Sequence, residues 1–332
     1  MKKITIGSRP SLVKNLLFVE GFARGGKLLL ANIVNGFSGV EPIQLYGLLE
    51  FIPVLERFKL IDKKTAQEVI RCEIDTHCYE MLIGRNFNYR KFDGSTIFNI
   101  PEYQKYLQRS TEKDTDKNLG KFYKDNIYSF FIMHGLLPNI KIYFDTFPDL
   151  KVIHIRRNPV DLFYSWHKRN LPGRFGKDPK IFMIPIKGKK GPVPWYAYRF
   201  KDKYHTISEN DRFVLCFSEL FRMNKNSYDK LPLRFKNQIL FVSYEELVFH
   251  KTNTVVKSIG KFLKRAPLPE MESILKRENA PRNAAHNKKC RTLEERFMCS
   301  ECKLREIKKV LSGKYLNILM GLKKKYEDGK IY

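Results

Sequence analysis

Short apolar runs recur along the chain, and stretches with helical spacing separate them. Four runs have the length and the β-branched or aromatic content of buried strands: Leu16–Glu20, Ile127–His134, Lys151–Ile155 and Ile239–Val242. Helical spacing covers four stretches: Lys27–Val34, most of residues 44–92, Val255–Leu263 and Leu293–Tyr326. This alternation predicts an α/β fold in three layers, α/β/α, with a mostly parallel central sheet of about five strands.

The length favours one large domain. At 332 residues, we expect a single α/β domain over residues 1–332, with a helical and basic C-terminal extension from about residue 265. Residues 170–194 are rich in Gly, Pro and Lys, which predicts a long loop or flap over the active site. Hydrophobic residues make up 43% of the chain, enough for a substantial core.

The charge balance changes the choice of partners. Lys and Arg number 62 against 35 Asp and Glu, a net charge of +27. Such a field favours polyanions: nucleic acid, anionic glycans, anionic lipid or nucleotides with several phosphates. A solvated basic surface without a partner is the alternative. Because the charge is spread along the chain rather than gathered in one tail, the sequence does not predict a specific nucleic-acid partner.

No stretch has the composition of a targeting or membrane segment. Residues 4–12 contain Gly7, Ser8, Arg9 and Pro10, which a signal-peptide core would not tolerate. No apolar run approaches the roughly 20 residues of a membrane span. We therefore expect a soluble chain, cytoplasmic by default.

A glycine-containing loop links the first expected strand to the first expected helix. Gly25 and Gly26 let the backbone approach an anion, and Arg24 and Lys27 add charge beside the N-terminus of the helix. Residues 21–27 match the first seven positions of a Walker A loop, but Leu28 stands where a Mg²⁺-binding hydroxyl is required. A tight turn with glycines for packing alone is the alternative.

A second candidate anion site follows the third expected strand. Arg156 and Arg157 lie at its carboxyl end, and Asn158-Pro159 is a favoured start of a helix. Ser165 lies about two turns along that helix, so Arg157 and Ser165 could both reach one phosphate. An exposed basic turn is the alternative.

Together these segments resemble the sulfotransferase family that uses PAPS, 3′-phosphoadenosine 5′-phosphosulfate. The family's 5′-phosphosulfate loop corresponds to Arg24–Leu28, although Lys27 and Leu28 stand where Thr-Thr is usual. Its 3′-phosphate motif, Arg-Asn-Pro with Ser eight residues after the Arg, is similar to Arg157–Ser165. A Tyr-Glu-Asp-Leu segment after a later strand resembles Val242–Leu247. The resemblance covers about residues 15–265, in the family's order.

The resemblance implies transfer of a sulfuryl group from PAPS to an acceptor hydroxyl, with adenosine 3′,5′-bisphosphate as the other product. Arg24 and Lys27 would neutralise the charge that develops on the departing 5′-phosphate, so no metal is required. The family places a base at the end of the intervening strand, which corresponds to His134. His77 is the reserve candidate. A histidine satisfied by a backbone carbonyl is the alternative for His134.

Two other functions remain open at this stage. A P-loop kinase or NTPase would take Ile142–Asp145 as its Mg²⁺-binding motif, but Leu28 argues against it. A non-catalytic polyanion-binding protein would depend on the charge alone. For the acceptor, the basic chain favours an anionic glycan, with small alcohols, phenols, lipids and peptide tyrosines as alternatives.

Three further groups have more than one interpretation each. His286, Cys290, Cys299 and Cys302 could hold zinc, form a disulfide or be inert thiols. The aromatic residues Trp195, Tyr196 and Tyr198 suit either a ring-bearing acceptor or the core. The basic stretch of residues 280–289 is either a loop that closes over the nucleotide or a solvated linker.

Overall fold

The chain forms two compact units. A computed structural model describes residues 4–114, 116–282 and 299–330. Unit 1 comprises Met1–Ile155 and Leu231–Pro281, and unit 2 comprises Arg156–Lys230 and Arg282–Tyr332. Since compact units need not fold independently, the expectation of a single domain over 1–332 stays a prediction.

A five-stranded sheet forms the centre of unit 1, with strand order β2-β3-β1-β4-β7. Its strands are β1 (Leu16–Gly21), β2 (Gln44–Leu45), β3 (Ser129–His134), β4 (Lys151–Arg156, which ends at the unit boundary) and β7 (Ile239–Ser243). The pairings of β1 with β3, β1 with β4 and β2 with β3 are parallel. The central strand β1 is buried along its whole length, as expected for a parallel strand that is covered on both faces.

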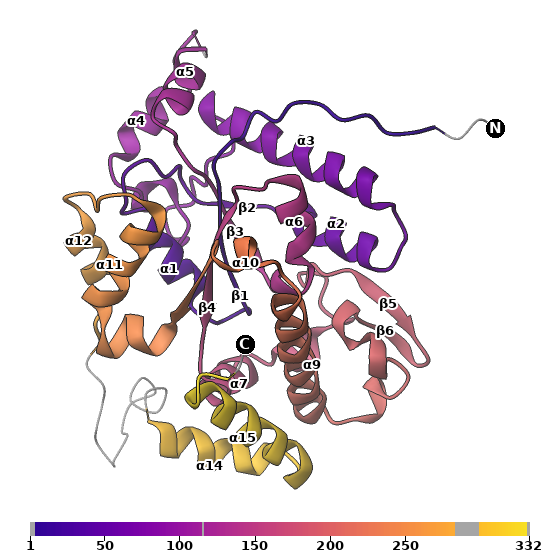
Figure 1. Cartoon of the computed structure of the whole chain (residues 1–332). Coiled ribbons are helices and arrows are strands. Elements are labelled where there is room, and N and C mark those ends of the chain that lie inside the picture. Colours follow the sequence, from indigo (N-terminus) through magenta and orange to yellow (C-terminus); the bar gives the residue numbers. More distant parts are fainter. Residues whose placement is uncertain (1–3, 115, 283–298, 331–332) are drawn as a thin grey trace. The chain divides into compact units, whose positions relative to one another are not determined.

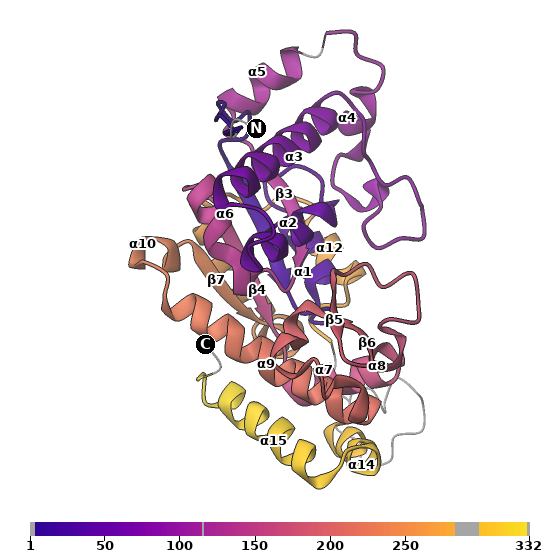
Figure 2. The same cartoon turned by 90° about the vertical axis from the view of Figure 1, so that its right-hand side faces the viewer.

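Helices cover both faces of this sheet (Figures 1 and 2). One face carries α1 (Lys27–Val34), α11 (Thr252–Leu263) and α12 (Met271–Arg277); the other carries α2 (Leu48–Arg57), α3 (Lys63–Leu82) and α6 (Ile140–Thr146). Three short helices complete unit 1: α4 (Tyr103–Gln108), α5 (Asp116–Lys124) and α10 (Leu233–Lys236). The three layers and the mostly parallel sheet predicted from the sequence are confirmed.

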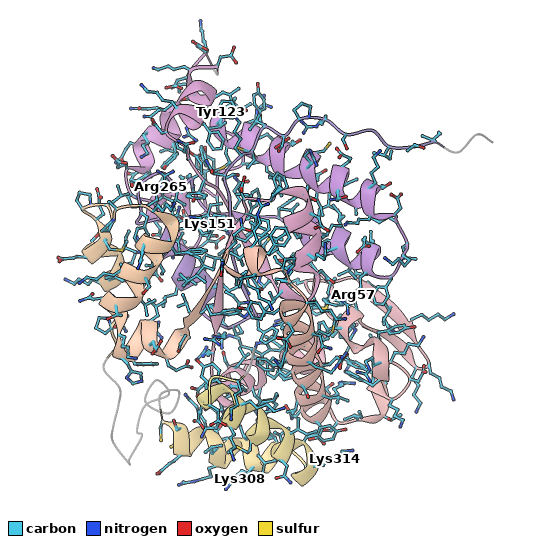
Figure 3. The ribbon with its side chains drawn as sticks, in the orientation of Figure 1. Arg57, Tyr123, Lys151, Arg265, Lys308 and Lys314 are labelled. Carbon is cyan, nitrogen blue, oxygen red and sulfur yellow. The ribbon has the colours of Figure 1, made fainter. Side chains whose placement is uncertain are left out.

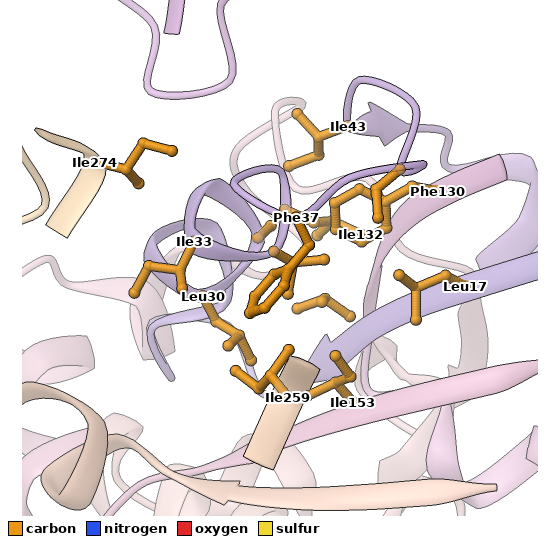
Figure 4. Close-up of a cluster of buried hydrophobic side chains, with 14 of the residues drawn as sticks. Leu17, Leu30, Ile33, Phe37, Ile43, Phe130, Ile132, Ile153, Ile259 and Ile274 are labelled. Atoms are coloured by element: carbon orange, nitrogen blue, oxygen red, sulfur yellow. The ribbon is translucent and has the colours of Figure 1, made fainter. Parts of the chain in front are cut away.

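Alternation along the strands builds a core on each face. Leu17 and Val19 of β1 belong to the buried hydrophobic cluster that also contains residues of α1, and Figure 4 shows Leu17 within that cluster. Phe18 points the other way, where its ring meets Tyr143 of α6 edge-on at 5.2 Å. Glu20 shares that second face and is fully buried.

Unit 2 is mainly helical. Among its described residues, the α-helices are α7 (Pro159–His167), α8 (Leu171–Arg174), α9 (Glu209–Asp229), α14 (Ser300–Val310) and α15 (Gly313–Glu327). Ser208 caps α9 by accepting a hydrogen bond from the Asp211 backbone N–H at 3.2 Å. None of the helices in the described ranges is both long and apolar enough to cross a membrane.

Two local expectations differ from the structure. Within the predicted loop 170–194, residues 185–194 form an antiparallel hairpin of β5 (Pro185–Gly188) and β6 (Gly191–Pro194). The prolines in these segments argued against strands in the sequence. An isolated two-stranded hairpin tolerates them, because both of its strands are edge strands. The short strand β2 was hidden within a stretch of helical spacing, since two residues carry no periodicity.

Candidate active site

The loop after β1 opens directly onto the N-terminus of α1. Gly26 is the N-cap residue with φ of 97°, and no side chain caps the helix. A Cβ atom at Gly26 would lie 2.5 Å from the Tyr244 ring, so only glycine fits this left-handed position. The first N–H groups of α1 have no acceptor within the helix. The loop therefore offers an anion a set of backbone donors and the positive end of the helix dipole.

Lys27 lies inside this loop rather than on its surface. The side chain is buried, and its ammonium donates to the carbonyl oxygens of Gly21 at 3.0 Å and Phe22 at 3.1 Å. Burial lowers the pKa of Lys27 to about 8, although the charges of Glu50 and Glu20 oppose that shift. Lys27 thus brings a positive charge behind the backbone donors of the loop.

Arg24 and Leu28 are the exposed members of the loop. Arg24 adopts φ of 63°, a left-handed conformation at the outer bend. Leu28 is 38% exposed and packs on Gly94, where an added Cβ would lie 2.6 Å from its methyl group. Leu28 offers no metal-binding oxygen.

The end of β3 is fixed beside this loop by backbone bonds. His134 pairs with Gly21 in the parallel register of β3 and β1. The Gly135 N–H donates to the Gly21 carbonyl at 3.1 Å, and the Leu136 N–H donates to Glu20 at 3.2 Å. The segment that carries His134 is therefore anchored to the strand that carries the loop.

Glu50 of α2 holds the His134 ring. Its Oε1 accepts from the His134 backbone N–H at 2.6 Å and lies 2.8 Å from Nδ1 of the ring. A carboxylate oxygen accepts, so Nδ1 is the donor in this contact and Nε2 is the ring nitrogen left for another partner. The His134 side chain is 46% exposed, so that nitrogen is open to an incoming group.

Two further contacts position this pair. Arg57, at the other end of α2, donates to the Pro138 carbonyl at 3.2 Å and to Asn139 at 3.1 Å (Figure 3). Beneath the loop, the buried carboxylate of Glu20 contacts Nδ1 of His154 on β4. Both ends of α2 are thus tied to the segment after β3.

The second predicted motif begins unit 2. Asn158 caps α7 by accepting a hydrogen bond from the Val160 N–H at 3.0 Å, as its sequence position predicted. Ser165 is buried on the second turn of α7, and Arg169 donates to its carbonyl at 3.4 Å. Arg157 directly precedes that cap and is partly buried. The local structure expected for this motif is present, while phosphate binding by Arg157 and Ser165 stays a prediction.

The reserve base and the rival metal motif lie in helices. His77 belongs to α3, and its ring contacts the Tyr46 ring at a tilt of 52°, with the ring centroids 3.9 Å apart. Burial lowers the pKa of His77. Asp145 lies in α6 and pairs with Lys63 at 2.7 Å and with Lys141. Since an NTPase holds Mg²⁺ with a carboxylate at the end of a strand, Asp145 is unsuited to that role.

The structure describes the aromatic group at residues 195–198 fully and the His/Cys group only in part. Trp195 and Tyr196 are buried, as the core reading expected, whereas Tyr198 is 54% exposed. Cys299 and Cys302 lie at the start of α14, where the Cys299 sulfur accepts a hydrogen bond from the Cys302 backbone N–H at 3.3 Å. His286, Cys290 and most of the basic stretch 280–289 lie outside the described residues. Within the described ranges, no three His, Cys, Asp or Glu side chains are grouped to hold a metal ion.

Glu50, Glu20 and His154 are the site residues that sequence reasoning missed. Glu20 and His154 carried a usable signal, because each is a polar residue inside a strand predicted to be buried and therefore requires a partner. Glu50 carried none, since acidic residues are common in the first turn of amphipathic helices.

Solved sulfotransferases show a distant likeness to this chain. The sulfotransferase domain of the curacin biosynthetic pathway has a TM-score of 0.47 at 13% identity, covering 93% of this chain and 98% of the other. The domain from the Synechococcus PCC 7002 olefin synthase gives 0.45 at 13%, covering 98% of each. Retinol dehydratase in complex with androsterone and the inactive cofactor PAP gives 0.34 at 14%, covering 96% and 81%.

The family comparison is more direct. No curated protein matches the sequence significantly. The model of the sulfotransferase domain, however, matches residues 17–315 and so takes in the loop, the His134 segment and the Arg157 motif. The chain therefore belongs to the sulfotransferase family.

Proposed function

We propose that this protein transfers a sulfuryl group from PAPS to a hydroxyl group of an anionic carbohydrate. The observation that carries the proposal is the juxtaposition, within unit 1, of an uncapped helix N-terminus and an oriented histidine. The first suits a phosphosulfate anion, and the second suits an acceptor that must lose a proton.

The donor would be divided between two motifs. The backbone of residues 24–28 and the Arg24 and Lys27 charges would hold the 5′-phosphosulfate, and Arg157 with Ser165 would hold the 3′-phosphate. PAPS supplies an activated sulfuryl group whose sulfur–oxygen bond to the 5′-phosphate breaks during transfer. Arg24 and Lys27 would stabilise the negative charge left on that phosphate, which removes the need for a metal ion.

His134 would act on the acceptor. Its Nε2 accepts the hydroxyl proton as the acceptor oxygen bonds to sulfur, and the ring becomes a cation. The Glu50 carboxylate beside Nδ1 stabilises that cation and prevents the ring from turning. In this assignment Glu50 is a positioning residue and His134 is the general base.

The β5–β6 hairpin supports an anionic acceptor. Residues 174–203 contain nine Lys and Arg against two Asp and Glu, a far higher positive density than the chain average. Lys187, Lys189 and Lys190 are exposed around the hairpin turn, and no described acidic group forms an ion pair with them. Nearby in the sequence, the exposed Tyr198 carries the Lys201 ammonium 5.3 Å from its ring centre. Exposed cations beside an aromatic face suit an acidic sugar chain.

Transfer of labelled sulfate tests the proposal. The protein is incubated with ³⁵S-labelled PAPS and a carboxylated polysaccharide, a neutral polysaccharide or a simple phenol. We expect label on the carboxylated polysaccharide, with loss of turnover in His134→Ala. Label on the phenol alone would contradict the acceptor class, and label on none of them in any buffer would contradict the function.

A charge-reversal pair tests the hairpin. Lys189→Glu/Lys190→Glu should raise KM for the polysaccharide at least tenfold. Lys308→Glu/Lys309→Glu changes the net charge equally on an exposed Lys-Lys pair of α14 (Lys308 is labelled in Figure 3) and should leave KM within about twofold. Equal losses in both variants would mean that only the overall charge matters.

A further inference from the structure

A pocket of about 490 Å³ lies in unit 1 at the end of the sheet where β1 and β3 begin. Residues 125 and 127 line it, just before β3 starts at Ser129, whereas His134 stands at the other end of that strand. Five residue steps along a strand span about 17 Å. A small ligand in this pocket would therefore be too far from His134 to contact an acceptor bound there.

The floor of the pocket is an internally neutral pair. Arg109 binds Glu41 through two hydrogen bonds, of 2.6 and 2.9 Å, and donates to the Met81 carbonyl at 3.2 Å. Both side chains are largely buried, and the Arg109 guanidinium stacks 4.8 Å from the Tyr106 ring centre. Because the charges of Arg109 and Glu41 neutralise each other, this pair adds no net charge to the pocket. The charge that a ligand meets therefore comes from the other lining residues.

Cations without an acidic partner form two of the walls. Lys117 and Lys121 are one turn apart on α5, so they share a face, and no described carboxylate pairs with either. Arg265 follows α11 in the chain and also lines the pocket. Its guanidinium lies over the Tyr128 ring, 5.4 Å from the ring centre. Figure 3 shows Arg265 and Tyr123 of α5 at this same end of the unit.

Arg265 has a buried donor without an acceptor. Its terminal nitrogen donates to the Asn126 carbonyl, which fixes the guanidinium against the loop before β3. Its Nε is buried and has no hydrogen-bond partner. Because a buried N–H without an acceptor is unfavourable, an acceptor that a ligand brings to Nε would be favoured there.

We propose that this pocket binds a small organic anion that carries a phosphate or sulfate ester. Lys117, Lys121 and Arg265 would contact the ester oxygens, because a tetrahedral group offers three acceptors to three cations. The volume lies within the roughly 300–1,000 Å³ typical of small-molecule sites and exceeds the needs of an inorganic ion. Two lining carboxylates, Glu112 and Asp125, would hydrogen-bond the hydroxyl groups of a sugar-like remainder.

Titration calorimetry with three probes tests the pocket. Glucose 6-phosphate and glucose 6-sulfate present the two esters, and glucose lacks both. Saturating adenosine 3′,5′-bisphosphate is added so that the loop after β1 does not compete. We expect at least one ester to bind, and glucose not to bind. Ester binding no stronger than that of glucose would overturn the proposal.

A matched pair of variants locates the binding. Lys117→Gln/Lys121→Gln should weaken ester binding at least tenfold. Lys113→Gln/Lys124→Gln removes the same charge from exposed lysines of the same segment that do not line the pocket, and should change the affinity less than twofold. Equal weakening in both pairs, or none in the first, would overturn the assignment. Turnover of the donor is not used as a readout, so failure of the sulfotransferase proposal would be seen separately.

Discussion

The buried ammonium of Lys27 predicts a specific pH dependence of donor binding. Its pKa of about 8 means that about nine-tenths of the molecules carry the charge at pH 7 and about one-tenth at pH 9. If the 5′-phosphate requires that charge, the affinity for adenosine 3′,5′-bisphosphate falls about tenfold between these pH values. The ligand's own phosphates are already ionised at pH 7, so they do not contribute to the fall.

Folding stability should change in the opposite direction. The folded pKa lies below the usual 10.5, so between about pH 8 and 10.5 the unfolded chain holds a proton that the folded protein lacks. The free energy of unfolding therefore gains about 3 kcal/mol from this group as pH rises through that window. Affinity and stability thus depend on pH with opposite signs.

Lys27→Met isolates both effects. Methionine fills the buried volume without a charge, and the two carbonyls lose little because each keeps a backbone donor: Gly135 N–H for Gly21 and Gly25 N–H for Phe22. Calorimetric titration at pH 7, 8 and 9 and urea unfolding at pH 8 to 10 should show that the variant lacks both dependences. Lys124→Met, at an exposed lysine of α5, serves as the control. The same tenfold fall in Lys27→Met would show that the Lys27 charge does not determine donor affinity.

Three other substitutions test separate parts of the site. Gly26→Ala should cost about 2–3 kcal/mol in urea unfolding, because the new Cβ meets the Tyr244 ring at a left-handed φ, whereas Gly120→Ala meets open space and should cost nothing; equal effects would contradict the packing. Arg157→Ala should weaken adenosine 3′,5′-bisphosphate far more than adenosine 5′-phosphate in competition binding, and parallel losses would remove the 3′-phosphate assignment. Glu50→Gln should lower kcat about tenfold, since a charge-assisted hydrogen bond to the His134 ring becomes a neutral one, while KM stays near its original value; an unchanged kcat would place the base elsewhere.

The sequence predicted those parts of the fold that local chemistry determines. The helix Lys27–Val34 was bounded correctly, because glycines precede it and Gly36 follows soon after it. The Asn158-Pro159 start of α7 was equally clear, since capping depends on adjacent residues. Strands β1, β3, β4 and β7 were each located to within two residues at either end.

Long-range pairing could not be predicted in the same way. Glu50 meets His134 across 84 positions only because α2 packs on β3, and nothing in either local sequence specifies that contact. The return of residues 231–281 to the first unit likewise depends on where β7 joins the sheet. The buried position of Lys27 was also unforeseen, because lysine is rarely buried without a carboxylate.

The proposed function requires that the protein bind a 3′-phosphorylated nucleotide without a metal ion. Titration calorimetry at moderate salt compares adenosine 3′,5′-bisphosphate with ATP plus Mg²⁺. We expect tight binding of the bisphosphate, unchanged by EDTA, and weak binding of ATP. Preference for ATP with Mg²⁺, or indifference to both nucleotides, would contradict the proposed function.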